Sequence, residues 1–242
     1  MMSNMIQGLP VAVFAYNFPH KKTQDFLFIL KVLGADVRLV LAADPVNLKI
    51  PPHSIRTKIR HIGLLHPKEI ADAFGLPYKV VRHNSAEVPS LVSEVGATIG
   101  VIAGARILKP YVINAFKLGV VNFHPGFIPE ARGLDAVLWS ILEGVPLGAT
   151  AHLIDEHIDA GTLLVKRKIP LYCDDTILDL TERVYETQLE MLGEALSLAA
   201  QGRGEPLRDL GKYHGKMPPD LEKKALLALP SYLARFAGCE ES

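Results

Sequence analysis

Alternating strand-like and helix-like segments in the first half of the chain constrain its fold more than any other feature. Short apolar runs typical of buried strands occur at 11–15, 36–42, 78–81, 98–104 and 120–123. Segments with helical spacing or helix-end signals lie between them, at 23–34, 66–75, 88–95 and 109–119. Strands that alternate with helices usually pair in parallel and carry helices on both faces of the sheet. The pattern therefore predicts an α/β fold with a doubly wound, mostly parallel sheet.

The second half of the chain departs from this alternation. After a helix near 134–142, two strand-like segments at 148–156 and 161–171 predict an antiparallel extension of the sheet. A long C-terminal helix follows at 176–201, with Asp174 or Asp175 as its predicted N-cap. The stretch "LEKKALLALPSYLARF" predicts one more helix, interrupted by Pro230. We expect a main domain at 1–201 and a short helical and loop extension at 202–242.

The composition argues against several classes of function. The chain has 242 residues with 26 basic and 26 acidic side chains, a balance that weakens any interpretation as a nucleic-acid-binding protein. We see neither a secretory signal pattern nor an apolar run near the ~18 residues of a membrane span, so we expect a cytoplasmic protein without a membrane partner. Cys173 and Cys239 lie far apart without a CxxC partner, which predicts neither a disulfide framework nor a thiolate metal site.

The stretch "VNFHPGFIPEARG" at 121–133 contains the first candidate site. Asn122 and His124 stand two residues apart where an apolar strand ends, and two prolines and two glycines restrict the loop that follows. In doubly wound sheets the ligand crevice lies outside the carboxyl ends of the strands, which is where this pair would emerge. Taken alone, the pair also fits an ordinary connection with a solvated histidine.

Three spaced blocks give the pair a context. "ARILKP" (105–110), "NFHPGFIPEARGLDAVLWSILEG" (122–144) and "GATAHLIDEHIDAGTLL" (148–164), together with the order of strands and helices, resemble the folate-dependent formyltransferase family. Its members include glycinamide ribonucleotide formyltransferases, methionyl-tRNA formyltransferases and sugar N-formyltransferases. The resemblance covers roughly residues 10–200 and implies a Rossmann-like sheet of the formyltransferase type, with 10-formyltetrahydrofolate as co-substrate.

The resemblance also implies roles for individual residues. The catalytic asparagine, histidine and aspartate of the family fall on Asn122, His124 and Asp159, and His152 matches a histidine that supports the aspartate. The segment that holds the pterin ring of the folate falls on Arg106, Ile107 and Leu108, and the facing loop supplies Asp155, Glu156 and His157. No metal is expected, because the histidine pairs lack carboxylate or thiolate residues at ligand spacing.

Chemistry explains why these residue types belong together. When an amine attacks a formyl carbon, negative charge grows on the oxygen, and donors already aimed at that oxygen lower the barrier. The Asn122 amide and a protonated His124 imidazole are such donors. Asp159 would keep the imidazole charged and help to remove the amine proton. One departure concerns the acceptor side, because Gly126 stands where many relatives carry serine.

The acceptor amine is the least determined part of the interpretation. The loop after the first strand, "AYNFPHKKTQDF", lacks the glycines that cradle a ribose phosphate in glycinamide ribonucleotide enzymes, although Lys21 and Lys22 could meet an anion. Methionyl-tRNA enzymes carry a C-terminal β-barrel and a basic surface, whereas this tail predicts helix and loop. Sugar N-formyltransferases share Arg132-Gly133, Trp139 and "ILEG", so a nucleotide-linked amino sugar is the favoured acceptor.

Two other questions stay open at this level. For the segment "KYHGKMPPD" a plain surface loop is favoured over a loop near the acceptor entrance, and a homodimer is neither indicated nor excluded. A hypothesis from another functional class is an inactive folate- or nucleotide-binding module that keeps the fold. The complete set of Asn122, His124 and Asp159 favours the enzyme, since a binding module has no need of all three.

Overall fold

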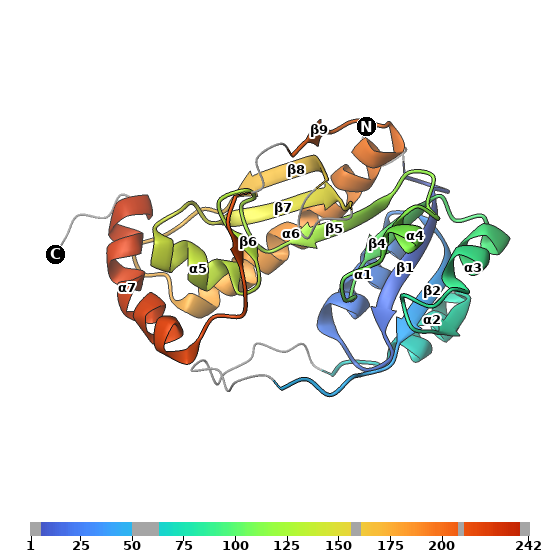
Figure 1. Cartoon of the computed structure of the whole chain (residues 1–242), viewed down its shortest axis with the longest axis horizontal. Helices are drawn as coiled ribbons and strands as arrows, with labels where there is room; N and C mark the ends of the chain where they lie inside the picture. The colour runs from blue at the N-terminus through green and yellow to red at the C-terminus, as the bar shows by residue number, and fades with distance from the viewer. Residues whose placement is uncertain (1–5, 50–62, 156–160, 208–210, 238–242) are drawn as a thin grey trace.

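An eight-stranded sheet forms the centre of the protein, with the strand order β3-β2-β1-β4-β5-β7-β8-β9 (Figure 1). The structure is a computed structural model that describes residues 6–49, 63–155, 161–207 and 211–237. Five neighbouring strands run parallel: β1 Pro10–Tyr16, β2 Asp36–Ala43, β3 Tyr78–Val80, β4 Ile99–Ile102 and β5 Val120–His124. The predicted doubly wound, mostly parallel sheet is confirmed.

Antiparallel strands complete the sheet on the other side of β5. They are β7 Gly148–Leu153, β8 Thr162–Lys168 and the short edge strand β9 Glu205–Pro206. The predicted antiparallel extension is therefore confirmed. A separate two-stranded sheet joins β6 Arg132–Gly133 to β10 Tyr213–His214, so a segment of the C-terminal extension pairs with the chain that follows β5.

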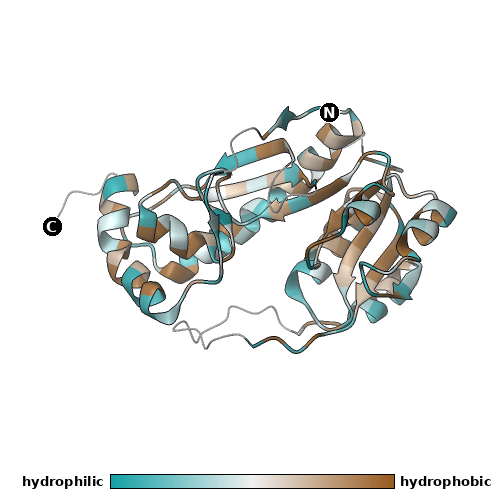
Figure 2. Cartoon of the chain, viewed as in Figure 1, coloured by the Kyte–Doolittle hydropathy of each residue, from teal (hydrophilic) through white to brown (hydrophobic). Residues whose placement is uncertain are grey.

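Helices cover both faces of the sheet. The first core cluster joins one face to α1 Lys21–Val32, α2 Pro67–Phe74 and α6 Ile177–Ala200, and the second joins the opposite face to α3 Val88–Val95 and α4 Pro110–Ile113. Strand β1 shows why: Val11 and Val13 belong to the first cluster, whereas Ala12 and Phe14 belong to the second, as the two-residue period of a strand requires. The apolar colouring of the central strands in Figure 2 follows from burial on both sides.

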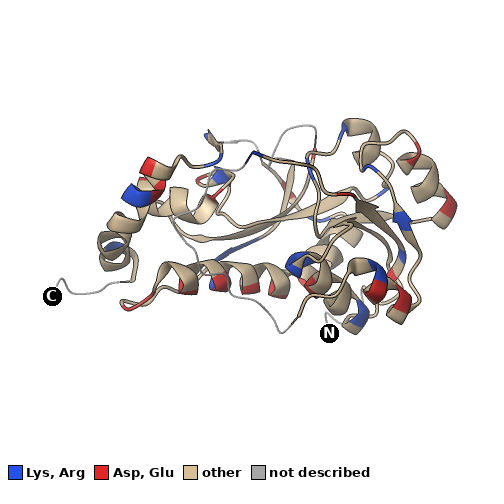
Figure 3. Cartoon of the chain, turned by 90° about the horizontal axis from the view of Figure 1, so that it is seen from below, with Lys and Arg blue, Asp and Glu red and all other residues tan. Residues whose placement is uncertain are grey.

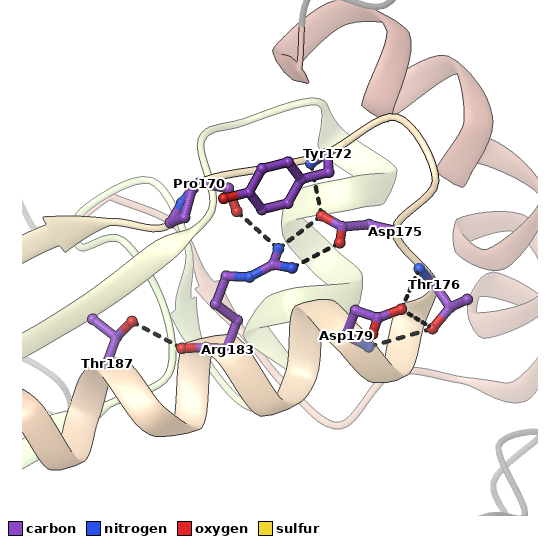
Figure 4. A network of polar contacts seen from close by, with 7 residues as sticks. All are labelled: Pro170, Tyr172, Asp175, Thr176, Asp179, Arg183 and Thr187. Atoms are coloured by element: carbon purple, nitrogen blue, oxygen red, sulfur yellow. Dashed lines mark hydrogen bonds and ion pairs between the residues drawn. The ribbon is translucent and has the colours of Figure 1, made fainter.

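The N-cap of helix α6 lies one residue beyond Asp175. Thr176 caps it in a capping box with Asp179, so the prediction of Asp174 or Asp175 is wrong. Asp175 instead accepts two hydrogen bonds from the Arg183 guanidinium, at 2.7 and 2.8 Å, and one from the Tyr172 N–H at 2.8 Å (Figure 4). These hydrogen bonds hold the pKa of the Asp175 carboxyl below its usual value, and its charge ties the start of α6 to the preceding loop.

Two other helices differ from the prediction by more than small shifts of their ends. The helix predicted at 109–119 ends at Ile113 in α4, and turns continue to Leu118. Conversely, α7 Pro219–Ala237 continues through Pro230, where an interruption was predicted. Proline removes one helical hydrogen bond. In α7 the residues just beyond it, Tyr232 and Leu233, are buried against a cluster shared with α5 Ala136–Glu143 and α6, and this packing offsets the loss.

The C-terminal extension therefore packs on the main body through β9, β10 and α7. Its separation from residues 1–201 as a distinct unit stays a prediction.

Cys173 is disulfide-bonded, which the wide spacing of the cysteines did not predict. Among the described residues, no helix has both the length and the apolar character needed to cross a membrane.

Charged residues of both signs are interspersed over the elements (Figure 3). Acidic positions recur along α6, and basic side chains of neighbouring elements pair with three of them. Glu182 pairs with Lys21 at 2.7 Å, and Arg167 pairs with Glu190 at 3.6 Å and with Glu194 at 2.5 Å. These ion pairs join α6 to α1 and to β8.

Candidate active site

Strand β5 places Asn122 and His124 on one side of the sheet. Residues two apart on a strand face the same way. Phe123 between them faces the opposite core, where its ring packs edge-on against Phe26 of α1 at 5.2 Å. Across the antiparallel pair with β7, Asn122 stands opposite His152 and His124 stands opposite Thr150. The carboxyl end of β5 and the part of β7 that pairs with it thus bring four polar side chains together.

His152 orients the Asn122 amide. The Asn122 Nδ2 atom lies 3.2 Å from His152 Nε2, inside the sheet where His152 is fully buried. An amide nitrogen can only donate, so His152 Nε2 accepts and the ring carries its hydrogen on Nδ1. This fixes which way the amide points. The sequence assigned His152 to support Asp159, but the contact described here is with Asn122, and Asp159 lies outside the described residues.

His124 is held by the main chain of its own loop. Its Nε2 atom lies 2.7 Å from the Ala131 carbonyl oxygen, and the residue is almost fully buried. Because a carbonyl can only accept, Nε2 carries a hydrogen and donates it. Any donation from His124 to a substrate oxygen therefore falls to Nδ1 and requires the imidazolium form. The chemical state assumed from the sequence, a protonated imidazole, is compatible with this geometry.

Thr150 of β7 fixes the loop that follows β5. Its hydroxyl donates to the Gly126 carbonyl at 2.7 Å and accepts the Ile128 N–H at 3.1 Å. The next peptide bond, between Ile128 and Pro129, is cis. The hydroxyl is fully buried, so both of its hydrogen bonds are needed to offset desolvation. The stiff loop inferred from its prolines and glycines is therefore also tied to the neighbouring strand.

The space around residue 126 explains why glycine stands at this position of the loop. A Cβ atom at that position would lie 2.3 Å from the Ala131 carbonyl oxygen and 2.6 Å from His124 Nε2. Both atoms belong to the hydrogen bond that orients the imidazole. Gly126 stands where many relatives carry serine. In this chain the His124–Ala131 hydrogen bond passes so close to the Gly126 backbone that a side chain there would collide with it.

Lys21 and Lys22 are engaged within the protein. Lys21 pairs with Glu182 of α6 and lies over the Tyr185 ring, 4.2 Å from its centroid. Lys22 donates to the Phe123 carbonyl at 2.9 Å and to Gln188 Oε1 at 3.0 Å. Burial lowers the pKa of Lys22 to about 7. These contacts place Lys22 behind the strand segment between Asn122 and His124, and they disfavour the earlier suggestion that the two lysines meet a substrate anion.

An aromatic group at the carboxyl end of β1 was not identified from the sequence. The Tyr16 and Phe18 rings stack with centroids 5.0 Å apart, and the His20 ring meets Tyr16 edge-on at 5.1 Å. The Tyr16 hydroxyl donates to the Ala105 carbonyl at 3.1 Å, beside the predicted folate segment. His20 caps α1 by accepting from the Thr23 N–H, and burial, followed by the charge of Lys22, lowers its pKa to about 4.

The predicted folate-binding residues are only partly described. Leu108 is buried in the second core cluster, whereas Arg106 is exposed and Ile107 is 65% exposed. Asp155 follows the end of β7, while Glu156, His157 and Asp159 lie outside the described residues. In the described part of the chain, no group of three or more His, Cys, Asp or Glu side chains could hold a metal ion.

The segment "KYHGKM" is fixed against the loop that follows His124. Strand β10 pairs with β6, and Gly133 makes this approach possible, since a Cβ atom there would lie 2.0 Å from the His214 carbonyl oxygen. His214 Nε2 lies 2.9 Å from Glu143 Oε1, and Lys216 pairs with Asp135 at 2.7 Å. These contacts rule out a plain surface loop for Tyr213–His214.

Comparisons with known proteins agree on one family. A family model described as formyl transferase matches residues 46–196. The methionyl-tRNA formyltransferase of Synechococcus sp. (strain JA-3-3Ab) is 30% identical over 144 residues, which are 58% of this chain and 45% of that protein. The trifunctional purine biosynthetic protein adenosine-3 of Chironomus tentans is 34% identical over 98 residues, or 40% of this chain and 7% of that protein. The chain thus spans less than half the length of these relatives.

Solved structures share the fold over most of their length. A sugar N-formyltransferase from Shewanella sp. FDAARGOS_354 aligns with a TM-score of 0.62 and 20% identity, over 91% of this chain and 87% of that one. A glycinamide ribonucleotide transformylase from Symbiobacterium toebii aligns with a TM-score of 0.62 and 19% identity, over 83% of this chain and 94% of that one. The two scores are equal, so the fold does not separate these two enzyme types.

Proposed function

Because the chain belongs to the formyl transferase family, whose model matches residues 46–196, we propose that it transfers a formyl group from 10-formyltetrahydrofolate to a primary amine. The observation that carries the proposal is the pair of Asn122 and His124 on one side of β5, each oriented by a hydrogen bond, at 3.2 Å to His152 and at 2.7 Å to Ala131. Donors held in this way need little reorganisation when negative charge develops nearby.

The proposed chemistry divides between three side chains. The Asn122 amide directs one N–H to His152, and we assign its second N–H to the formyl oxygen. His124 would donate to the same oxygen from Nδ1, as the imidazolium. We assign to Asp159 the roles of keeping that ring charged and of taking the amine proton, directly or through water. The folate co-substrate supplies the formyl group.

The proposed folate site uses the segments on either side of these donors. Arg106, Ile107 and Leu108 would hold the pterin ring with their main chain, and Asp155, Glu156 and His157 would form the facing wall. The exposure of Ile107 beside the buried Leu108 supports this assignment, because a ligand would cover an apolar side chain that otherwise meets water.

We propose a nucleotide-linked amino sugar as the acceptor. The internal contacts of Lys21 and Lys22 support this choice over glycinamide ribonucleotide, since neither lysine is directed at a substrate phosphate. The pairing of Arg132-Gly133 with β10 brings the Tyr213 ring beside Arg132, next to the loop that follows His124. Glycinamide ribonucleotide and methionyl-tRNA are the alternative acceptors.

A direct assay tests the proposal. The purified protein is mixed with 10-formyltetrahydrofolate and a panel of nucleotide-linked amino sugars, glycinamide ribonucleotide and charged methionyl-tRNA, and release of tetrahydrofolate is followed. We expect release with at least one amino sugar and none without an amine. Release only with glycinamide ribonucleotide or the tRNA would reassign the acceptor. Folate binding without turnover across the panel would instead indicate an inactive binding module.

A further inference from the structure

The loop between β3 and α3 carries an asparagine that contacts the proposed folate segment on both sides of Leu108. The Asn84 Nδ2 atom donates to the Ile107 carbonyl at 2.9 Å, and Asn84 Oδ1 accepts the Lys109 N–H at 2.8 Å. The two contacts join residues 23 and 25 positions apart in the sequence. A single side chain thus bridges two main-chain groups of one short segment.

Only a carboxamide can make both contacts at this position. The Ile107 carbonyl needs a donor and the Lys109 N–H needs an acceptor, and an amide group offers both on one short side chain. Aspartate has nearly the same shape, but it would place a carboxylate oxygen against the Ile107 carbonyl oxygen. The choice of residue therefore matters chemically as well as sterically.

The loop that carries Asn84 is itself anchored to the sheet. The neighbouring His83 places its Nε2 atom 3.0 Å from the carbonyl oxygens of both Ala15 and Leu41, at the carboxyl ends of β1 and β2. Burial lowers the pKa of His83, which favours the neutral ring. From the other side, the Tyr111 hydroxyl of α4 donates to the Asn84 carbonyl. Asn84 therefore transmits the position of the sheet to residues 107–109.

These contacts hold a segment whose neighbouring side chains meet different surroundings. Leu108 is 5% exposed and packs in the core, whereas the neighbouring Ile107 is 65% exposed. The main chain of this segment is thus held in place while an apolar side chain faces solvent. A preformed binding surface requires this arrangement, because the segment then loses little freedom when a ligand binds.

We propose that Asn84 is a positioning residue for folate binding, whose carboxamide fixes the main chain at 107–109 as the wall that holds the pterin ring. This inference rests on the proposed function. It assigns Asn84 no contact with the reacting atoms, so its effect should fall on the affinity for the folate and not on the chemical step.

Two variants and one control test the role. Asn84→Ala removes both contacts, and Asn84→Asp keeps the acceptor for Lys109 but loses the donor to Ile107. Asn114→Ala is the control, because Asn114 is an exposed asparagine at the end of the adjacent helix α4. For each protein, the Kd for tetrahydrofolate is measured by calorimetry, and the melting temperature is measured with and without tetrahydrofolate.

We expect the Kd to rise roughly tenfold in both Asn84 variants, as for the loss of one or two neutral hydrogen bonds that preorganise the site. Their unliganded melting temperatures should stay close to that of the unmodified protein, and the shift on adding tetrahydrofolate should shrink. The control should match the unmodified protein in all three quantities. A lower unliganded melting temperature with an unchanged Kd would show a purely structural role.

The outcomes also separate this inference from the function on which it rests. Absence of tetrahydrofolate binding by the unmodified protein would overturn the proposed function together with the inference. Binding by the unmodified protein at the same Kd as Asn84→Ala and Asn84→Asp would overturn the inference alone.

Discussion

Asn122 is the side chain on which the proposed chemistry depends most. Replacing it with alanine removes one donor to the formyl oxygen, and loss of one such donor typically costs ~2.7–4 kcal/mol in the transition state. We expect Asn122→Ala to lose roughly a hundred- to thousandfold in kcat, measured by tetrahydrofolate release at saturating substrates. Asn114→Ala serves as the matched control, and unchanged turnover in Asn122→Ala would exclude the donor role.

Gly126 gives a second prediction at the scale of one residue. In Gly126→Ala the new Cβ would lie 2.3 Å from the Ala131 carbonyl oxygen, so the loop must shift and the His124–Ala131 hydrogen bond must lengthen. We expect a loss of about 1–3 kcal/mol in the free energy of unfolding and a fall in kcat. Denaturant titration and the turnover assay measure the two effects.

Gly215→Ala is the control for this change. A Cβ atom at Gly215 meets nothing within 4 Å, so the substitution should leave both quantities near those of the unmodified protein. Equal stability of Gly126→Ala and Gly215→Ala would mean that the loop tolerates a side chain beside His124.

Burial of the His20 side chain is expected to make the stability of the protein depend on pH. Its pKa falls from 6.5 to about 4 in the folded protein, chiefly because the ring is buried. Between these two values the unfolded chain binds a proton that the folded protein does not, so the free energy of unfolding decreases as the pH falls from about 6.5 to about 4. Below about 4 both states are protonated, and the penalty is fully present.

Asparagine at position 20 can still cap α1 but does not titrate. We therefore expect the stability difference, His20→Asn minus unmodified, to increase on acidification through this window and to be constant above pH 7. Urea titrations at several pH values measure it. A difference that stays constant from pH 7 to pH 4 would contradict burial of a neutral His20.

At the scale of the elements, the N-terminus of α6 offers the clearest test. Thr176 closes a capping box with Asp179, and removal of such a cap costs about 0.5–2 kcal/mol. Thr176→Ala should lower the free energy of unfolding by about 1 kcal/mol in a denaturant titration. Thr181→Ala is the matched control, since the Thr181 hydroxyl bonds back to the Ile177 carbonyl within the helix. It should be neutral or slightly stabilising, and equal losses in the two variants would disprove the cap.

Local patterns predicted most elements, and they failed where packing replaced local preference. Phe116 lies in the turns that follow α4, yet its side chain is buried in the core. Its spacing from the apolar residues of α4 therefore resembled the spacing of a longer helix. Helix α7 passes Pro230 because Tyr232 and Leu233 pack against α5 and α6. The α6 cap was predicted at Asp174 or Asp175, but Asp175 binds Arg183 and Thr176 caps the helix instead.

For the whole molecule, the fold and the position of Asn122 and His124 at the end of a strand follow from the sequence because both obey general rules. Alternating strands and helices predict a doubly wound sheet, and such a sheet presents ligands at the carboxyl ends of its strands. Contacts between distant segments follow no such rule. Lys22 reaches the Phe123 carbonyl across 101 positions, and His152 meets Asn122 across 30. The sequence singled out both residues but with other partners, an anion for Lys22 and Asp159 for His152, so the contacts described here had to come from the structure.

The central claim is that Asn122, His124 and Asp159 surround a single carbonyl at the carboxyl end of β5. A crystal structure of the protein with tetrahydrofolate bound measures this directly. We predict that Asn122 Nδ2 and His124 Nδ1 point to one common position beside the folate, with the Asp159 carboxylate facing the imidazolium ring and lying within about 2.6–3.2 Å of the attacking amine or of a bridging water. An Asp159 carboxylate directed away from His124, with the folate bound elsewhere, would contradict the claim.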